Sequence, residues 1–148
     1  MSKYMKLMEN KVWPAFKATN YYDSSLVNRM KVVDSSYGKL KCELKVTEDL
    51  LNIQGSLHGG CTATMIDAVS SFCFLTMDDF NAGVSLDMNI SYMKGAKPGE
   101  KLTIESSVLK DKGTIRFADV HITNEDGQMI ACGKHTKSMN NINILHQD

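Results

Sequence analysis

The segment GGCTATMIDAVSSFCFLTM, residues 59–77, is the most informative about the fold, because its apolar side chains leave no continuous polar face. A surface helix keeps such a face, so a helix that is apolar nearly all round is a buried helix. Apolar and polar residues alternate strictly on either side of it, in residues 39–46 (KLKCELKV) and 84–92 (VSLDMNISY). Period-two alternation is typical of half-buried antiparallel strands. We therefore expect an α+β fold in which a curved antiparallel sheet is wrapped around one long buried helix.

Further elements are expected on both sides of this centre. An earlier strand is predicted at residues 25–33, and an amphipathic N-terminal helix within residues 1–20, which Pro14 should end or restart. The remaining strands are predicted at residues 101–110, 114–123 and 128–137. Together with residues 84–92 they should form a four-stranded meander. Residues 140–148 carry little signal and are expected to be a flexible tail.

Composition limits the classes of function. The 148 residues, 43% of them hydrophobic, suit one domain spanning residues 1–148. Lys plus Arg equals Asp plus Glu at 17 each, so no overall charge draws the chain to nucleic acid or to a membrane surface. Without a signal-peptide core, a long apolar run or paired cysteines, the chain is expected to be intracellular and cytoplasmic, with no membrane insertion. The N-terminal lysines leave a mitochondrial location as an alternative.

The residues that could carry chemistry gather at the start of the buried helix. His58, Gly59 and Gly60 stand where the first N–H groups lack partners within the helix and the helix dipole is positive. Two glycines let a ligand approach the backbone, so a carbonyl oxygen that gains negative charge could bind there. The alternative is that Gly59 and Gly60 only ease a tight turn into the helix.

Asp67 is the second candidate, because a carboxylate among Met65, Ile66, Ala68 and Val69 is costly to desolvate unless it is paired. Burial there would raise its pKa and suit it to act as a general base or nucleophile. The alternative is a structural carboxylate that caps a loop or bonds across a dimer interface.

The spacing of these two candidates has a consequence for assembly. Gly59 and Asp67 are eight residues apart, so a helix rising about 1.5 Å per residue separates them by roughly 12 Å. One carbonyl group cannot touch both. If both act on one substrate, they come from different subunits, which predicts a symmetric dimer with two shared sites.

The other polar residues give weaker signals. Ser85 belongs to the polar side of its strand, and on pattern alone it faces solvent. His121 and His135 fall on predicted strands, where lone histidines are usually structural. A triad of Ser56, His58 and Asp67 is not expected, because the loop has no nucleophile elbow. No metal-ligand spacing or phosphate-binding loop occurs.

Five motifs together give a more specific indication. They are N-x-x-G-x-L-H-G-G-x-x-A-T-x-x-D (52–67), G-V-S-x-D-M-N-I-x-Y-M (83–93), A-K-x-G-E (96–100), V-L-K (108–110) and G-K-H-T-K (133–137). The chain resembles the PaaI-like group of the hotdog-fold thioesterase superfamily over about residues 38–137. The resemblance implies a hotdog fold and hydrolysis of medium- to long-chain fatty acyl-CoA. It also implies a homodimer as the minimum active unit, a homotetramer as the assembly, and no cofactor, since coenzyme A is part of the substrate.

The resemblance also implies roles for residues at matching positions. Asp67 would activate water or attack directly, and the Gly59 N–H would polarise the carbonyl. Asn52 and His58 would support that donor, and Ser85 would position the water near Asp67, in place of facing solvent. Contacts to coenzyme A would be made by Tyr92, Lys110, Asp111, Lys112, Gly113, Thr114, Ile115, Lys137 and Ser138.

Two other functions fit the same fold. One is a non-catalytic acyl-CoA-binding or scaffolding module, since a fold alone does not establish activity. The other is an enoyl-CoA hydratase, which would also use an acidic residue and a histidine near the helix.

Overall fold

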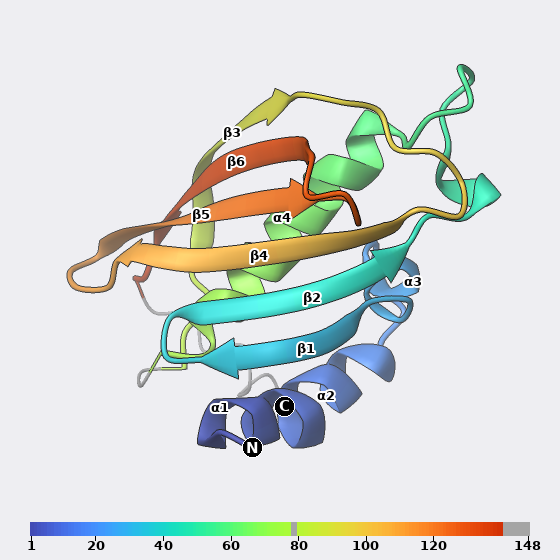
Figure 1. The fold of residues 1–148 in the computed structure, drawn as a ribbon. Helices are drawn as coiled ribbons and strands as arrows, with labels where there is room; N and C mark the ends of the chain where they lie inside the picture. The colour runs from blue at the N-terminus through green and yellow to red at the C-terminus, as the bar shows by residue number, and fades with distance from the viewer. Residues whose placement is uncertain (78–79, 141–148) are drawn as a thin grey trace.

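The computed structural model describes residues 1–77 and 80–140. Figure 1 shows a curved sheet wrapped around one long helix, with shorter helices beside β1. The elements in chain order are α1 (Lys3–Leu7), a π-helical turn (Met8–Val12), α2 (Trp13–Lys17), α3 (Ser24–Val27), β1 (Lys31–Ser36), β2 (Lys39–Lys45), a 3-10 turn (Glu48–Leu50), α4 (Gly59–Phe74), β3 (Val84–Tyr92), β4 (Lys101–Lys110), β5 (Ile115–Thr123) and β6 (Met129–Ser138). The expected helix-wrapped antiparallel sheet is confirmed.

Helix α4 is the centre of the core, as its apolar sequence predicts. Met65, Ile66, Val69, Phe72 and Cys73 are buried between α4 and the sheet. Only two residues of this helix, Gly60 and Asp67, are exposed. The helix begins one residue after His58, which caps it, and ends at Phe74. An exposed carboxylate on a helix that is otherwise covered is the first structural indication of a working site.

The sheet has the order β1-β2-β4-β5-β6-β3, and each neighbouring pair is antiparallel. The expected four-stranded meander is therefore wrong in one strand: β4, β5 and β6 form it, whereas β3 pairs with β6 at the far edge. Alternation of apolar and polar residues identifies a strand, but it does not determine which strand pairs with it. Since α4 connects β2 to β3, the chain leaves the helix at the free edge beside β6.

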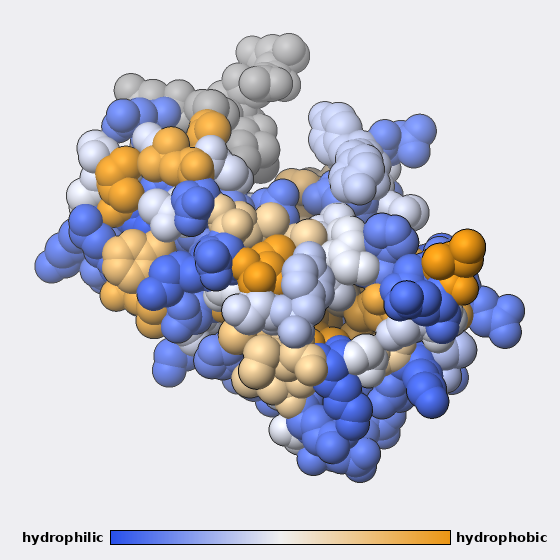
Figure 2. All heavy atoms as spheres, turned by 90° about the horizontal axis from the view of Figure 1, so that it is seen from above, coloured by the Kyte–Doolittle hydropathy of each residue, from blue (hydrophilic) through white to orange (hydrophobic). Residues whose placement is uncertain are grey.

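Strand β3 is largely exposed, although its sequence alternates as a half-buried strand does; only Met88 and Ile90 are partly buried against the core. Leu86 is 55% and Tyr92 57% exposed, and Val84 is also exposed. Seen from above, the molecule shows hydrophobic side chains interspersed among hydrophilic ones (Figure 2). An edge strand with exposed apolar side chains and unpaired backbone groups is a typical surface for association with another chain.

The N-terminal helix packs beside the core, and Pro14 restarts it as predicted. Pro14 stands in the first turn of α2, directly after the π-helical turn, where its missing N–H is tolerated. The Trp13 and Phe16 rings lie 5.1 and 4.6 Å from the Phe72 ring of α4. The predicted early strand is shifted, because residues 24–27 form α3 and β1 begins at Lys31. Of the expected tail, all but Asn140 lies outside the described residues.

Within residues 1–77 and 80–140, no helix has both the length and the apolar character needed to cross a membrane.

Candidate active site

The start of α4 carries a backbone donor without an internal partner. The Gly60 N–H donates to His58 Nδ1 at 2.8 Å, and the Thr62 N–H donates to the His58 carbonyl at 3.1 Å. Among the described residues, the Gly59 N–H has no acceptor. Since His58 Nδ1 accepts, the imidazole hydrogen of the neutral ring is on Nε2, where it is available as a second donor. Gly59 is thus free to bind an oxyanion at the positive end of the helix dipole.

Asn52 and Tyr92 hold this region in place. Asn52 Oδ1 accepts from the N–H groups of Gln54 (2.9 Å) and Ser56 (3.2 Å), which closes the loop that leads into α4. The Tyr92 hydroxyl donates to the Gly59 carbonyl at 3.1 Å, and its ring lies against Gly59. We name Asn52, His58, Gly59 and Tyr92 the helix-entrance cluster.

A cavity of about 330 Å³ opens beside this cluster. Its walls come from the loop before α4, the first turn of α4, and the chain that follows β3. The lining residues are Asn52, Gln54, Ser56, Leu57, Gly59, Thr62, Tyr92, Met93, Lys94, Gly95, Ala96 and Ile130. Three of the residues expected at the site, Asn52, Gly59 and Tyr92, therefore line one cavity.

Asp67 lies two turns further along α4. Its side chain is 54% exposed, so the expectation of a desolvated carboxylate is wrong for the single chain. Its Oδ1 accepts weakly from Ser71 Oγ at 3.4 Å and lies 3.8 Å from Nδ1 of His135. The carboxylate therefore faces solvent on one side and a buried polar group on the other.

His135 lies beneath Asp67, fully buried between β6 and α4. Its Nδ1 is 2.7 Å from Ser70 Oγ, and its Nε2 is 2.8 Å from Oγ of Ser85 on β3. Burial, followed by the nearby Lys137 ammonium, lowers the pKa of His135 to about 4, with Asp67 and Asp87 acting in the opposite direction. His135 is therefore a neutral ring near pH 7 that connects β3 to α4.

Lys137, two residues along β6, is also buried. Its Nζ donates to Ser71 Oγ at 2.6 Å. Burial lowers the pKa of Lys137 to about 8, and Asp67 opposes this. The structure thus places Lys137 under α4, in contact with the serine that bonds to Asp67, and not on the surface. We name Asp67, Ser70, Ser71, Ser85, His135 and Lys137 the Asp67 cluster.

The remaining expected contacts of coenzyme A lie at the Asp67 end of the sheet. The segment from Lys110 to Ile115, which includes Asp111, Lys112, Gly113 and Thr114, forms the hairpin between β4 and β5. Ser138 pairs with both Val84 and Ile115, so the hairpin reaches the beginning of β3. Tyr92 stands at the other end of β3, roughly 23 Å from Ser85 at about 3.3 Å per residue.

The expected site residues thus fall into two groups within one chain. The helix-entrance cluster contains four of them, and Asp67, Ser85 and Lys137 belong to the other cluster, next to the hairpin (Figure 1). The roughly 12 Å predicted between Gly59 and Asp67 applies, because α4 is helical without interruption between them. The unpartnered Gly59 N–H and the Asp67 carboxylate therefore belong to different groups of one chain.

Three residues of the Asp67 cluster were missed from sequence: His135, Ser70 and Ser71. For His135 the sequence does contain an indication: along β6, His135 and Lys137 lie on the same inward-facing side of the strand as Ala131 and Gly133. At Gly133 a Cβ atom would lie 3.1 Å from Ile66, so the missing side chain lets α4 approach the strand. That approach brings His135 against Ser70.

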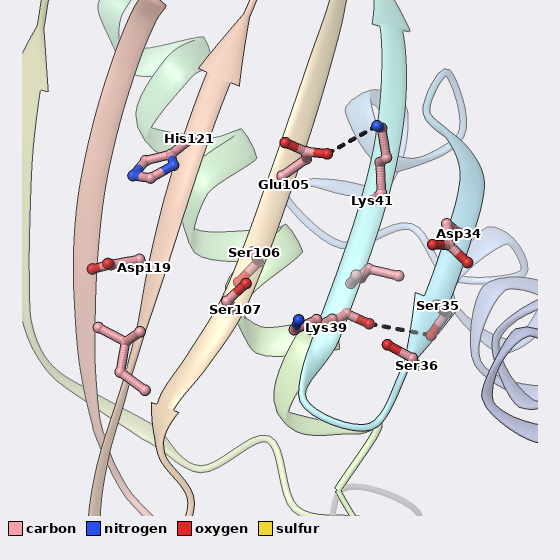
Figure 3. A pocket seen from close by; sticks show the side chains of 12 residues that line it. Asp34, Ser35, Ser36, Lys39, Lys41, Glu105, Ser106, Ser107, Asp119 and His121 are labelled. Carbon is pink, nitrogen blue, oxygen red and sulfur yellow. Dashed lines mark hydrogen bonds and ion pairs between the residues drawn. The ribbon is translucent and has the colours of Figure 1, made fainter.

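A larger hollow, of about 470 Å³, lies on the opposite face of the sheet and contains no expected site residue. Figure 3 shows it with α4 behind the sheet, lined by charged and polar side chains of β1, β2, β4 and β5. Lys41 and Glu105 pair across it at 2.9 Å, and both are exposed. Among the described residues, no three His, Cys, Asp or Glu side chains are arranged as metal ligands.

Comparison with known proteins agrees with this placement. Residues 54–131, more than half of the chain, match the thioesterase superfamily model. Human acyl-coenzyme A thioesterase 13 is 42% identical over 126 residues, covering 84% of this chain and 89% of the human protein.

Solved structures give the same result. Zebra fish thioesterase superfamily member 2 is 38% identical with a TM-score of 0.83, covering 88% of this chain and 94% of its own. A hypothetical thioesterase from Streptococcus pneumoniae, solved with coenzyme A, is 26% identical with a TM-score of 0.73, covering 76% and 87%. This chain therefore belongs to the thioesterase superfamily and has its hotdog fold.

Proposed function

We propose that this protein is an acyl-CoA thioesterase that hydrolyses medium- to long-chain fatty acyl-CoA to the fatty acid and coenzyme A. The observation that carries the proposal is the pair formed by the unpartnered Gly59 N–H and the exposed Asp67 carboxylate on one helix. The relative named acyl-coenzyme A thioesterase 13 and the neighbour solved with coenzyme A support the substrate class.

The reaction needs water, a base and an oxyanion donor, and no cofactor. In the proposed mechanism water attacks the thioester carbonyl carbon while Asp67 takes one of its protons. The carbonyl oxygen becomes an oxyanion, and the Gly59 N–H stabilises it. When the intermediate collapses, the C–S bond breaks, coenzyme A leaves as a thiolate and Asp67 returns the proton to sulfur. Direct attack by Asp67 through an anhydride is the alternative route to the same products.

Because Gly59 and Asp67 of one chain are too far apart for one carbonyl, the site is proposed to form between two subunits. The exposed edge of β3 supports this. If two copies of β3 paired antiparallel about their middle residue, Met88, Tyr92 of one strand would lie opposite Val84 of the other. The helix-entrance cluster of each subunit would then face the Asp67 cluster of its partner.

The same pairing suggests where coenzyme A binds. The Lys110–Ile115 hairpin lies at the Asp67 end of the sheet, and Tyr92 of the partner subunit would approach that end. Lys110 and Lys112 supply positive charge suited to phosphate groups. A homotetramer made of two such dimers and a cytoplasmic or mitochondrial location stay predictions, which sedimentation and imaging of the tagged protein would test.

The direct experiment follows release of coenzyme A from palmitoyl-CoA with a thiol reagent. Wild-type protein should release it, and Asp67→Asn should lower kcat by about 10²- to 10⁴-fold. Asp119→Asn, on the opposite face of the sheet, is the control and should retain full activity. Equal rates for wild type and Asp67→Asn would overturn the assignment of Asp67.

The same assay separates the alternative functions. Tight acyl-CoA binding by calorimetry without release of thiol would indicate a binding module. Loss of the ultraviolet band of an enoyl-CoA would indicate a hydratase. A series of acyl-CoA chain lengths would test the proposed preference for medium and long chains.

A further inference from the structure

The Asp67 cluster contains a buried histidine whose two ring nitrogens each contact a serine. Ser70 Oγ lies 2.7 Å from the Ile66 carbonyl oxygen and 3.0 Å from the Asp67 carbonyl oxygen. Carbonyl oxygens only accept hydrogen bonds, so the single Ser70 hydroxyl hydrogen must point at them. Toward His135 Nδ1, at 2.7 Å, Ser70 can therefore only accept. Nδ1 must carry a hydrogen.

The position of Asp67 favours the same tautomer. Its Oδ1 lies 3.8 Å from Nδ1, and a negative oxygen favours a hydrogen on the nitrogen that faces it. His135 has no exposed surface, and the ammonium of Lys137 is close by on the same strand. Both conditions keep the ring neutral, and a neutral imidazole has only one N–H. Nε2 therefore carries a lone pair.

The lone pair on Nε2 determines the direction of the hydrogen bond between His135 and Ser85. Ser85 Oγ lies 2.8 Å from Nε2, so the Ser85 hydroxyl donates its hydrogen to the ring. Ser85 is exposed on its other side, where only its oxygen lone pairs are available. Ser85 is thus held as an acceptor, one imidazole ring away from the Asp67 carboxylate.

We propose that His135 is a positioning residue for the hydrolysis, which fixes the Ser85 hydroxyl so that Ser85 accepts a hydrogen bond from the attacking water. This inference rests on the proposed function. A water between Asp67 and Ser85 would donate one hydrogen to each, which leaves its lone pairs free to attack the carbonyl carbon. A Ser85 that donated its hydrogen to the water would occupy one of those lone pairs.

The test uses two amide substitutions that differ in reach. In His135→Gln the side-chain oxygen can take the place of Nε2 and accept from Ser85. In His135→Asn the shorter amide can reach Ser70 but not Ser85. We expect His135→Gln to keep kcat within about threefold of wild type and His135→Asn to lose roughly tenfold, the value of one hydrogen bond. KM for palmitoyl-CoA should change by less than about twofold in both.

The same pair is then made in the Ser85→Ala background, where the proposed role no longer exists. There His135→Gln and His135→Asn should have equal kcat. Equal kcat for the two variants with Ser85 present would overturn the proposal. The proposal would also be overturned if the ratio of kcat for His135→Gln to kcat for His135→Asn were unchanged by Ser85→Ala. The ring would then act by packing or by contacting the reacting groups itself, and not through Ser85.

A second variant covers the case in which the His135 variants do not fold. Ser70→Ala removes the acceptor for Nδ1–H, so it should lower kcat when Ser85 is present and not in Ser85→Ala. Ser106→Ala is the control, since Ser106 is equally buried and its hydroxyl has no partner among the described residues. Equal loss from Ser70→Ala in both backgrounds would contradict the proposal. Coenzyme A release by the wild-type protein separates this proposal from the proposed function. No release from any acyl-CoA would overturn the proposed function, whereas release by wild type together with an additive cycle would overturn only the role of His135.

Discussion

The start and the middle of helix α4 contribute to the site in different ways. At its start, the helix-entrance cluster offers a backbone N–H and is held by short-range bonds, such as Gly60 to His58 and Ser56 to Asn52. The Asp67 cluster offers side chains only, and it is held by contacts between residues 50 to 66 positions apart, His135 to Ser85 and Lys137 to Ser71. Three of the four residues of the first cluster are therefore close in sequence, and only Tyr92 reaches it from β3. The second cluster exists only once β3, β6 and α4 have packed together.

Loss of the backbone donor of the helix-entrance cluster should have a larger effect than the changes described in the following paragraphs. Gly59→Pro removes the N–H without ending the helix, because proline suits the first helical position and His58 already has extended backbone. Its kcat should fall by about 10²- to 10³-fold. Gly59→Ala keeps the N–H, and its Cβ would meet Tyr92 at 3.4 Å, an ordinary contact, so it should retain most activity. If both variants were equally impaired, the donor would not be the Gly59 N–H.

The second prediction concerns the stability of the Asp67 cluster against acid. His135 has a folded-state pKa of about 4 against 6.5 in the unfolded chain, so the unfolded chain binds more protons between these values. The free energy of unfolding should therefore decrease as the pH falls from about 6.5 to 4, by at most on the order of 3 kcal/mol. Burial is the main cause of this low pKa; among the charged groups, Lys137 lowers it further, and Asp67 and Asp87 oppose the shift.

Urea unfolding at a series of pH values measures that decrease. His135→Gln should flatten the curve in this window, whereas His121→Gln, on the opposite face of the sheet, should leave it unchanged. A slope that survives His135→Gln would assign the acid sensitivity to other groups.

The third prediction separates activity from stability at Lys137. Lys137→Met removes the donor to Ser71, which in turn contacts Asp67, so kcat should fall roughly tenfold. The melting temperature should not fall, because methionine fills similar space without the desolvation of a buried ammonium. Lys134→Met, an exposed lysine of the same strand, is the control. A large loss of stability with unchanged kcat would make Lys137 structural.

The smallest effect is expected at Tyr92, where only one hydrogen bond within the helix-entrance cluster is lost. Tyr92→Phe keeps the ring against Gly59 and removes the bond to the Gly59 carbonyl. We expect kcat to fall by about two- to fivefold, as measured by coenzyme A release. A loss as large as that of Gly59→Pro would mean that the hydroxyl itself contacts the substrate.

The sequence locates the loop and the cap of the helix-entrance cluster because these determinants are adjacent, whereas the contact of Tyr92 with Gly59 is not apparent from it. Residues 52–67 carry the loop closure, the cap and the free N–H in one continuous motif, and the apolar pattern of 59–77 correctly predicts a buried helix. Asp67 was selected because a carboxylate among apolar neighbours was expected to be buried, but in the single chain its side chain is exposed. The position was recognisable because the polar residue interrupts an apolar helix.

The Asp67 cluster could not be predicted from the sequence in the same way. Its members come from α4, β3 and β6, and the place of β3 beside β6 depends on where the chain leaves α4, which alternation does not encode. His135 is one histidine on a strand, and its role follows only from the two serines that tertiary packing brings to its nitrogens. Sequence can mark such residues as inward-facing, but it does not identify their partners.

The two clusters are expected to work together only across two subunits. The most direct measurement co-expresses Gly59→Pro and Asp67→Asn chains with different tags and purifies the mixed dimer. One of its two sites would combine an intact Gly59 with an intact Asp67, so coenzyme A release should recover to about half of the wild-type rate per dimer. A mixed dimer no more active than its two inactive parents would rule out the shared site, because each chain would then have to supply both residues of its own site.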